Sequence, residues 1–357
     1  MKGTLYKCDS NGFINFTPGL VLCGKYRMRR QLGSGTFSRV FECDRVHNDS
    51  DPNLKQKYAV KVIRNVRCYQ TAAETELDIL RMIGANDPDD ASCCIHLVDN
   101  DYFCGHSKMR NHPILVFPLM SHSICDFMRL HEHRPFCYDD AIVLLEQICR
   151  GVAFMHSLNV IITDLKPENI VFVVDDGFFS SPRSLEIKLI DFGSAVVHRP
   201  GQKHYGLIQT RHYRAPEVVL NMEWDSKVDV WSIGCILVEL ICGRLLFNTH
   251  CSIDHLNQMM RCVGSPPRAL LDDVDDGTWS NHFDQDGNLR MDQAEVSPHQ
   301  SSGLCQYFVA HPLHEKGDDL KRVQLFDLCS RMLCWDPLHR ISAKEALRHS
   351  VFQNKSK

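Results

Sequence analysis

The first third of the chain alternates apolar and polar residues over short stretches rich in β-branched and aromatic side chains. This pattern predicts strands at residues 26–32, 39–45, 57–63, 95–103 and 113–117, with a single helix at 72–83. Residues 1–25 precede these elements, and we expect them to form an irregular or strand-like leader.

Beyond residue 117 the apolar residues recur at helical spacing. Within residues 139–156, for example, Ile142, Leu145, Cys149 and Val152 fall on one face of a helix. The most apolar stretch, 230–243, is too short to span a bilayer and carries Glu239, so it is expected to be a buried helix. Segments 176–184 and 264–302 are predicted to be loops, the second one long and acidic.

A β-rich front joined to a helical back predicts an α+β fold with two lobes and a ligand cleft between them. The expected domain covers residues 26–353, with a small lobe at 26–117 and a larger helical lobe at 118–353. The acidic segment at about 265–302 would be an insert in the larger lobe.

Composition narrows the function classes. The net charge of −4 gives no general attraction to nucleic acid or to an anionic membrane, so neither is expected as a direct partner. The 17 cysteines are scattered without a C-x-x-C pair, which indicates reduced thiols in the cytosol or nucleus. A zinc site among them stays open as an alternative, although the usual ligand spacing is absent. No apolar core of a signal peptide follows the first residues.

A glycine-rich segment between the first two predicted strands is the first candidate for chemistry. Gly33 and Gly35 would allow backbone N–H groups to approach phosphate oxygens without a Cβ in the way, although a plain turn would have the same composition. The residues expected to contact a nucleotide here are Leu32, Gly33, Ser34, Gly35, Thr36, Phe37, Ser38 and Val40.

The next strand ends in Tyr58-Ala59-Val60-Lys61, which places a lysine at the distance from the glycines that a phosphate-binding lysine needs. Glu76 in the predicted helix is the expected carboxylate partner of Lys61. Glu74 competes for this role, and Glu76 is preferred because Leu77 and Leu80 then fall on the inner face of the helix.

Three further polar residues follow an apolar stretch at D-x-K-x-x-N spacing. Asp164 would orient an acceptor hydroxyl and take its proton, Lys166 would contact the γ-phosphate, and Asn169 would supply an amide oxygen to Mg²⁺. Asp191, in Asp-Phe-Gly, would chelate the same ion. Each motif alone is common, but all of them in this order, ending in Ala-Pro-Glu217, are hard to obtain by chance.

With these motifs the chain resembles a eukaryotic protein kinase over about residues 26–352. The resemblance implies the bilobal kinase fold, with ATP and Mg²⁺ as cofactors. It also implies that Asp229, in DVWSIG, braces the catalytic loop, and that Arg340 pairs with Glu217.

Within the kinases, the motifs TDLKPEN at 163–169, DFGSA at 191–195, TRHYRAPE at 210–217 and DVWSIGCIL at 229–237 are similar to those of the LAMMER, or CDC-like, dual-specificity family. The EHLAMMER motif itself corresponds to DHLNQMMR at 254–261, which keeps His255, Leu256, Met259 and Arg261. The chain is identified as a divergent member of this family.

Two departures concern activation. Most kinases have His-Arg before the catalytic aspartate, and this chain has Ile162-Thr163, which removes the usual partner of an activation-loop phosphate. Leu207 stands where the related DYRK kinases have a second activation-loop tyrosine. Both departures predict that no loop phosphate is needed for activity.

The segment that would pair with adenine is expected after Phe117. There the carbonyl of Pro118 and the backbone of Met120 would meet the base. The apolar residues expected on the two faces of the base, which would also serve as ordinary core residues, are Val40, Ala59 and Val171.

The resemblance implies phosphorylation of Ser and Thr, with Tyr as a further acceptor, in basic or Arg/Ser-rich proteins such as splicing factors. It implies residence in the nucleus, with the cytoplasm as a second place. The alternatives are a mainly chromosomal or kinetochore role for the same enzyme, a catalytically weak scaffold, and another kinase branch. The acidic insert would attract basic substrates, or would simply be a solvated loop.

Overall fold

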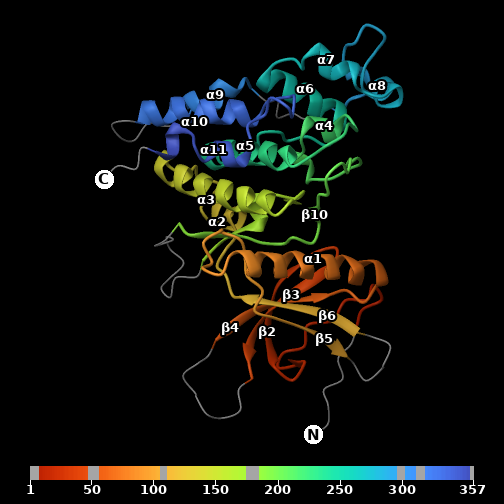
Figure 1. The fold of residues 1–357 in the computed structure, drawn as a ribbon, viewed down its shortest axis with the longest axis vertical. Coiled ribbons are helices and arrows are strands. Elements are labelled where there is room, and N and C mark those ends of the chain that lie inside the picture. Colours follow the sequence, from red (N-terminus) through yellow and green to blue (C-terminus); the bar gives the residue numbers. More distant parts are fainter. Residues whose placement is uncertain are drawn as a thin grey trace. The chain divides into compact units, whose positions relative to one another are not determined.

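The computed structural model describes residues 8–46, 56–104, 111–173, 185–295, 302–310 and 318–353. The loop predicted at 176–184 lies outside the described residues. The chain divides into two compact units. The first contains Met1–Ser121 with Asp191–Ser194, and the second contains His122–Ile190 with Ala195–Lys357. The observed architecture is α+β, with a sheet in the first unit and helices in the second (Figure 1).

The first unit is built on an antiparallel sheet with the strand order β1-β2-β3-β4-β6-β5. Its strands are β1 (Val21–Leu22), β2 (Tyr26–Ser34), β3 (Ser38–Arg45), β4 (Lys57–Ile63), β5 (Asp99–Cys104) and β6 (Asn111–Pro118). The register places Lys61 of β4 opposite Val40 of β3 and Leu115 of β6. The prediction of a strand from residue 95 is wrong at its start, because residues 95–98 follow a turn in which Cys93 has a φ of 63°.

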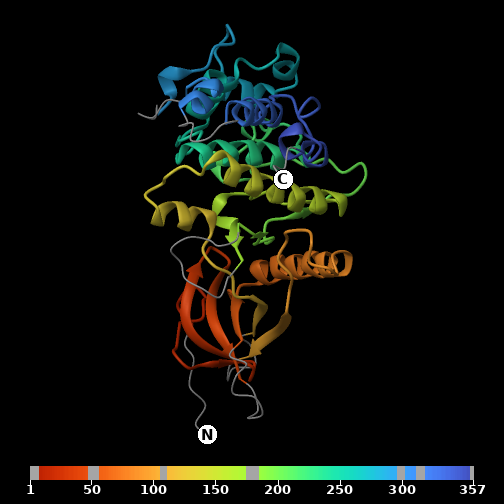
Figure 2. The same ribbon diagram turned by 90° about the vertical axis from the view of Figure 1, so that its left-hand side faces the viewer.

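Helix α1 (Arg67–Asn86) packs against β4 and β6, and Figure 2 shows it along one face of the sheet. It is longer than predicted at both ends. The buried residues Ala73, Ile79, Leu80 and Ile83 share one face with Glu76, whereas Leu77 is only half-buried.

The leader belongs to the first unit's core. Ile14, Leu20 and Leu22 are buried in one apolar cluster with residues of β2, β3, β4 and β6. Phe16 stacks on Phe41 of β3, with 6.1 Å between the ring centroids. The described part of this segment, residues 8–25, therefore packs into the first unit.

The second unit is helical. Its elements are α2 (Ile124–Leu130), α3 (Tyr138–Ser157), β7 (Val160–Ile161), η1 (Pro167–Asn169), β8 (Ile170–Phe172), β9 (Ile187–Leu189), β10 (Val196–Val197), η2 (Arg211–Tyr213), α4 (Pro216–Val219), α5 (Lys227–Cys242), α6 (Ser252–Val263), α7 (Arg268–Asp272), α8 (Asp276–His282), η3 (Met291–Gln293), α9 (Leu304–Ala310), α10 (Asp318–Met332), α11 (Ala343–Ala346) and η4 (Ser350–Phe352). β7 pairs with β10 and β8 pairs with β9, both antiparallel.

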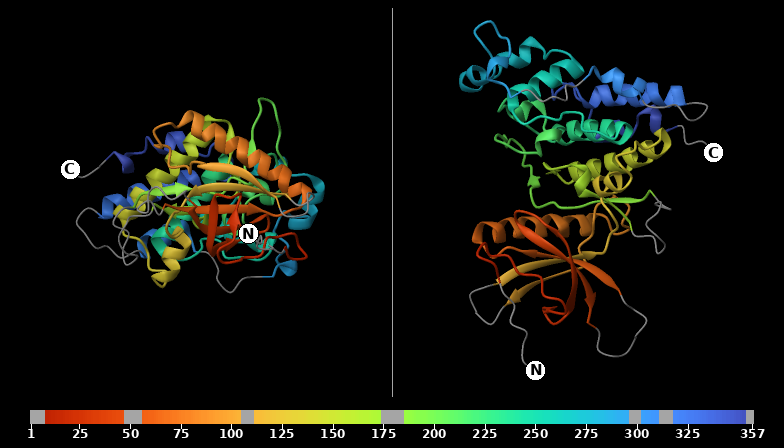
Figure 3. Two further views of the ribbon diagram at one scale, coloured as in Figure 1. Left: turned by 90° about the horizontal axis from the view of Figure 1, so that it is seen from below. Right: turned by 180° about the vertical axis from the view of Figure 1, so that it is seen from behind.

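Helix α5 is the centre of the second unit. It is rich in apolar residues and largely buried, and it packs against α3 and α10, an arrangement visible from behind in Figure 3. Gly243 ends it with a φ of 68°, and a Cβ at that position would collide with the carbonyl oxygen of His133. The prediction of a buried helix here is confirmed. No helix among the described residues combines the length and the apolar character needed to cross a bilayer.

The prediction of a loop over 264–302 is wrong, because α7, α8 and η3 lie within it. Asp275 caps α8 by accepting the Thr278 N–H over 2.9 Å. Trp279 stacks on buried Phe283 at 4.6 Å, and Leu270 in α7 is also buried, so the insert contributes apolar side chains to the packed interior. Figure 1 shows α7 and α8 beside α6.

Candidate active site

The glycine-rich segment forms the turn between β2 and β3. The Gly35 N–H donates to the Ser38 carbonyl over 2.9 Å. Neither Gly33 nor Gly35 has a positive φ, and a Cβ added to either would meet no atom within 4 Å. The fold of this unit therefore does not itself require glycine at these two positions.

Lys61 lies at the centre of a buried charged group in the first unit. Its Nζ is 2.7 Å from Oε1 and 2.9 Å from Oε2 of Glu76, and 2.8 Å from Oδ1 of Asp191. Burial alone would lower the pKa of Lys61, but the two carboxylates outweigh it and raise the pKa well above the usual value. Glu74, the competing partner, is exposed on another face of α1.

The Asp191-Phe192-Gly193 segment is held close to this group. Asp191 has a φ of 63°, and its side chain remains 50% exposed after it accepts from Lys61. A Cβ at Gly193 would lie 3.3 Å from Oδ1 of Asp191 and 3.4 Å from Oε2 of Glu76. Glycine at position 193 thus lets the chain pass directly over the ion pairs.

The other predicted nucleotide contacts divide between the units. Ala59 pairs with Phe117, and Tyr58 pairs with Pro118 at the end of β6. Leu32 and Phe37 are exposed, Met120 is half-buried, and Ser38 is buried. Val171, by contrast, is buried in β8 of the second unit.

In the second unit, Asp229 holds the catalytic loop by its backbone. Its carboxylate accepts the N–H groups of Ile162 and Thr163, each over 2.9 Å, and Nε2 of His156 over 2.9 Å. Asp229 has no exposed surface. Ile162, where most kinases have histidine, is buried among apolar residues.

Asp164 is tied to two side chains of its own unit. Its carboxylate accepts from Nζ of Lys166 over 2.7 Å and from the hydroxyl of Thr210 over 2.7 Å. Lys166 also contacts the Thr210 oxygen at 3.0 Å. Asn169 donates Nδ2 to the Asp164 carbonyl over 2.9 Å, which leaves its Oδ1 as the atom suited to a cation. Thr210 was not among the predicted site residues, since its only signal is membership of the TRHYRAPE motif.

Glu217 and Arg340 form a bidentate pair, with Nη1–Oε1 and Nη2–Oε2 distances of 2.6 and 2.8 Å. Both side chains are buried, at 1% and 0% exposure. The guanidinium also donates to the carbonyls of Lys227, Cys334 and Trp335. The start of α4 is thereby fixed to the segment after α10.

The carboxyl group of Glu239 contacts the TRHYRAPE motif through Tyr213. The Tyr213 hydroxyl donates to Oε2 of Glu239 over 2.7 Å. Burial raises the pKa of Glu239 to about 7, despite this hydrogen bond, which lowers it. Glu239 therefore titrates near neutral pH.

The LAMMER-like segment forms α6 and is largely buried. His255 has no exposed surface, and burial, followed by the nearby charges of Arg214 and Arg211, lowers its pKa to about 3. Asn257, Gln258 and Met260 depart from EHLAMMER, whereas Asp254 is a conservative replacement. Nε2 of Gln258 donates to Oδ2 of Asp254 over 2.8 Å, so each of these two residues supplies a partner for the other.

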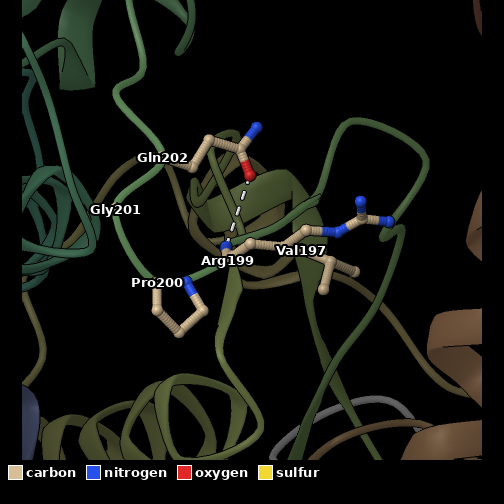
Figure 4. A pocket seen from close by; sticks show the side chains of 5 residues that line it. All are labelled: Val197, Arg199, Pro200, Gly201 and Gln202. Carbon is tan, nitrogen blue, oxygen red and sulfur yellow. Dashed lines mark hydrogen bonds between the residues drawn. The ribbon is translucent and has the colours of Figure 1, made fainter.

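A group of metal-ligating side chains, a cysteine and a surface hollow lie outside the groups described above. Among the described residues, Asp87, Asp90 and His96 are the group of three metal-ligating side chains, and no cysteine belongs to it. Cys125, at the start of α2, is not favoured as a reactive thiol, because burial raises its pKa. A shallow hollow after β10 is lined by Val197, Arg199, Pro200, Gly201 and Gln202, none of them a predicted site residue (Figure 4).

Comparison with known proteins agrees with this geometry. The protein kinase domain model matches residues 26–352. The chain is 35% identical to serine/threonine-protein kinase AFC2 of Arabidopsis thaliana, over 96% of this chain and 80% of that protein. It is 35% identical to dual specificity protein kinase CLK1 of Mus musculus, over 96% and 69%, and 34% identical to dual specificity protein kinase lkh1 of Schizosaccharomyces pombe, over 96% and 49%. The chain therefore belongs to the protein kinase family, within it to the LAMMER dual-specificity group, and is a protein serine/threonine kinase.

Proposed function

We propose that this kinase transfers the γ-phosphoryl group of Mg·ATP to Ser and Thr hydroxyls, with Tyr as a further acceptor, of basic or Arg/Ser-rich proteins. The observation that carries the proposal is the pair of polar groups described above. Lys61, Glu76 and Asp191 form one, and Asp164, Lys166 and Thr210 form the other.

The first group is suited to phosphate. Lys61 is held charged and in place by two carboxylates, so its Nζ is ready for phosphate oxygens without a search over rotamers. Gly33 and Gly35 are not required by the fold, and close approach of a polyphosphate to the backbone gives a reason for both.

The second group is suited to an acceptor hydroxyl. Thr210 occupies Asp164 with a hydroxyl hydrogen bond of 2.7 Å, which is the interaction that a substrate Ser or Thr would make with the same carboxylate. Asp164 would orient the acceptor and receive its proton, and Lys166 would accompany the charge that develops on the transferred group.

Each unit supplies an oxygen donor of the kind that Mg²⁺ prefers. In the first unit this donor is the half-exposed Asp191 carboxylate, and in the second unit it is the amide oxygen of Asn169, whose Nδ2 donates to the Asp164 carbonyl. Mg²⁺ bound by such oxygens neutralises charge on the phosphate groups. The hard oxygen donors favour Mg²⁺ over zinc.

The test is a comparison of Asp164→Asn with the wild-type protein in peptide phosphorylation and in nucleotide displacement. We expect kcat to fall by about 100-fold or more while nucleotide affinity stays within about 2-fold, since Asp164 orients the acceptor. Asp78→Asn, at a side chain that is 75% exposed on α1, is the matched control and should change neither. Wild-type kcat in Asp164→Asn would remove Asp164 from the proposed role.

The acidic insert supports the choice of basic substrates. Between residues 266 and 300 the sequence has eight acids and two bases. Asp273, Asp276, Asp286 and Asp292 are exposed. Hydrogen bonds from Thr278, and a smaller contribution from Asn221 just after α4, lower the pKa of Asp275, so the insert approaches the segment that follows the TRHYRAPE motif. Exposed carboxylates there would attract arginine-rich chains, and salt would weaken the effect.

Two of the acidic residues in the insert have structural roles, which limits the substitutions that can test its part in substrate binding. Asp275 caps α8, and Asp284 accepts the N–H groups of Asp286 and Asn288, so both must be kept. The double variant Asp273→Asn with Asp276→Asn should raise KM for an arginine-rich peptide about threefold at low salt and leave kcat unchanged. A double change at Asp139 and Asp319 removes the same charge elsewhere in the unit and serves as control. An unchanged KM at low salt would exclude the insert from recognition.

We also propose that the protein acts in the nucleus, with the cytoplasm as a second place, because Arg/Ser-rich and chromosome-associated proteins are the expected substrates. Imaging of the tagged full chain tests this. Location on chromosomes alone, through division, would favour the kinetochore role over one in splicing.

A further inference from the structure

A thiol and a buried imidazole meet in the first unit, apart from the groups that carry the proposed chemistry. Sγ of Cys8, in the leader, lies 3.3 Å from Nε2 of His112, near the start of β6. His112 has no exposed surface, whereas Cys8 is half-buried. The two residues are 104 positions apart in the sequence.

The hydrogen bonds of His112 determine which nitrogen faces the thiol as a base. Nδ1 is 2.8 Å from the carbonyl oxygen of Ile63. A carbonyl oxygen only accepts, so Nδ1 carries the hydrogen. In the neutral ring, Nε2 then presents its lone pair to the S–H group of Cys8.

A nucleophile beside a base, with the base oriented by a third group, is the arrangement that activates a thiol. Here the third group is the Ile63 carbonyl, at the end of β4. The thiol is also held in position. Cys8 forms a backbone bridge with buried Ile14, and Asp9 next to it forms an ion pair with Arg39 over 2.8 Å.

Several of the other described cysteines are made less reactive by burial. Burial raises the pKa of Cys43 to about 12 and also raises the pKa of Cys149 and Cys125. Cys68 and Cys305 are exposed and serve as internal references of greater accessibility than Cys8.

We propose that Cys8 is a modification site, a thiol activated by His112 that reacts with soft electrophiles and with hydroperoxides. In the reaction with a hydroperoxide, the thiol proton moves to Nε2 of His112 and the sulfur attacks the terminal peroxide oxygen. The S–O bond forms as the O–O bond breaks. Cys8 is oxidised to a sulfenic acid, and the peroxide is reduced to an alcohol, which takes the proton from His112.

Modification would act on a defined neighbour. Asp9 follows Cys8 directly and contacts Arg39 in β3, the strand that begins after the glycine-rich turn. Arg39 also donates to the Ile14 carbonyl over 2.9 Å. A larger group on Cys8 would strain the leader at the point where it is anchored to β3.

The test is alkylation of the full chain at pH 6.5 with limiting iodoacetamide, followed by peptide mass spectrometry. We expect Cys8 to react about tenfold faster than Cys68 or Cys305, although both are more exposed. His112→Gln should slow Cys8 to the reference rate and leave the two references unchanged. Treatment with limiting hydrogen peroxide and the sulfenic-acid trap dimedone should label Cys8 first.

Equal rates at Cys8, Cys68 and Cys305 in the wild-type protein would overturn the proposal. This comparison needs no variant, so it stands even where His112→Gln fails to fold. A His112→Gln protein that folds and keeps the fast rate would also overturn it, as would dimedone label spread evenly over the exposed cysteines.

Discussion

The backbone N–H of Thr163 donates to Oδ1 of Asp229 over 2.9 Å, at a residue whose φ is 63°. A β-branched residue is disfavoured in this left-handed region, so the conformation persists only because the surroundings impose it. Asp229 does so from the buried first turn of α5, and Thr163 directly precedes Asp164. The position of the proposed catalytic carboxylate thus depends on a helix that does not itself carry it.

Asp229→Asn should therefore both destabilise the protein and lower turnover. All three bonds to Asp229 come from donors, two backbone N–H groups and the His156 ring. An amide must place its NH₂ group against one of them, and we expect a loss of about 2–4 kcal/mol in urea unfolding. Asp78→Asn provides the matched exposed change. Stability equal to wild type would show that Asp229 does not hold the loop.

Phosphatase treatment should leave most activity in place. Thr163 stands where most kinases have the arginine that anchors a loop phosphate, and Thr210 is already bonded to Asp164 and Lys166. Peptide phosphorylation before and after treatment measures the effect. Tyr205 is 57% exposed, so it is the accessible acceptor in this segment, and Tyr205→Phe should behave like wild type. Activity lost on treatment and regained with one loop phosphate would contradict this prediction.

Glu239 should make stability depend on pH. Its pKa is raised by burial from 4.5 to about 7, so the folded state holds this proton more tightly than the unfolded state. The contribution of Glu239 to the free energy of unfolding is fully present below about pH 4.5. It is lost as the pH rises toward 7, and the loss amounts to up to about 3 kcal/mol. Glu239→Gln should gain stability relative to wild type between pH 5 and pH 8 in urea unfolding. The exposed Glu74→Gln is the control, and parallel pH curves for Glu239→Gln and wild type would refute the prediction.

Gln258 and Asp254 should be coupled. Gln258→Met removes a buried hydrogen bond to Asp254 and is expected to cost about 1–3 kcal/mol. Asp254→Glu in addition restores both residues of the EHLAMMER motif at these positions, and we expect it to recover part of the loss. A double-mutant cycle in urea measures this, and strictly additive effects would show that the two side chains are not energetically coupled.

The sequence predicted the elements with strong periodicity best. The strand Lys57–Ile63 and the buried helix α5 follow directly from apolar patterning. The prediction of a loop for the insert was wrong because α7 and α8 are short, and α8 is stabilised by its Asp275 cap and by the stacking of Trp279 on Phe283. Helices of five and seven residues carry too little periodicity to be distinguished from an acidic loop.

The candidate site was predictable where a motif has a fixed order. Lys61 and Glu76 could be paired because only two carboxylates in the predicted helix were spaced suitably, and the structure pairs Lys61 with Glu76. The contacts of Tyr213 with Glu239 and of Cys8 with His112 could not be predicted from local sequence patterns. The residues of the first pair are 26 positions apart and those of the second pair 104, and only the folded chain brings them together.

The bond between Glu217 and Arg340 has a consequence for the order in which this protein is completed. The carboxylate leaves the ribosome 123 residues before its guanidinium partner. Until Arg340 has been synthesised, the Glu217 carboxylate lacks the cation that pairs with it in the folded protein, where the Glu217 side chain is 1% exposed. The segment at the start of α4, close in sequence to Thr210, can therefore take its final form only after Arg340 has been synthesised.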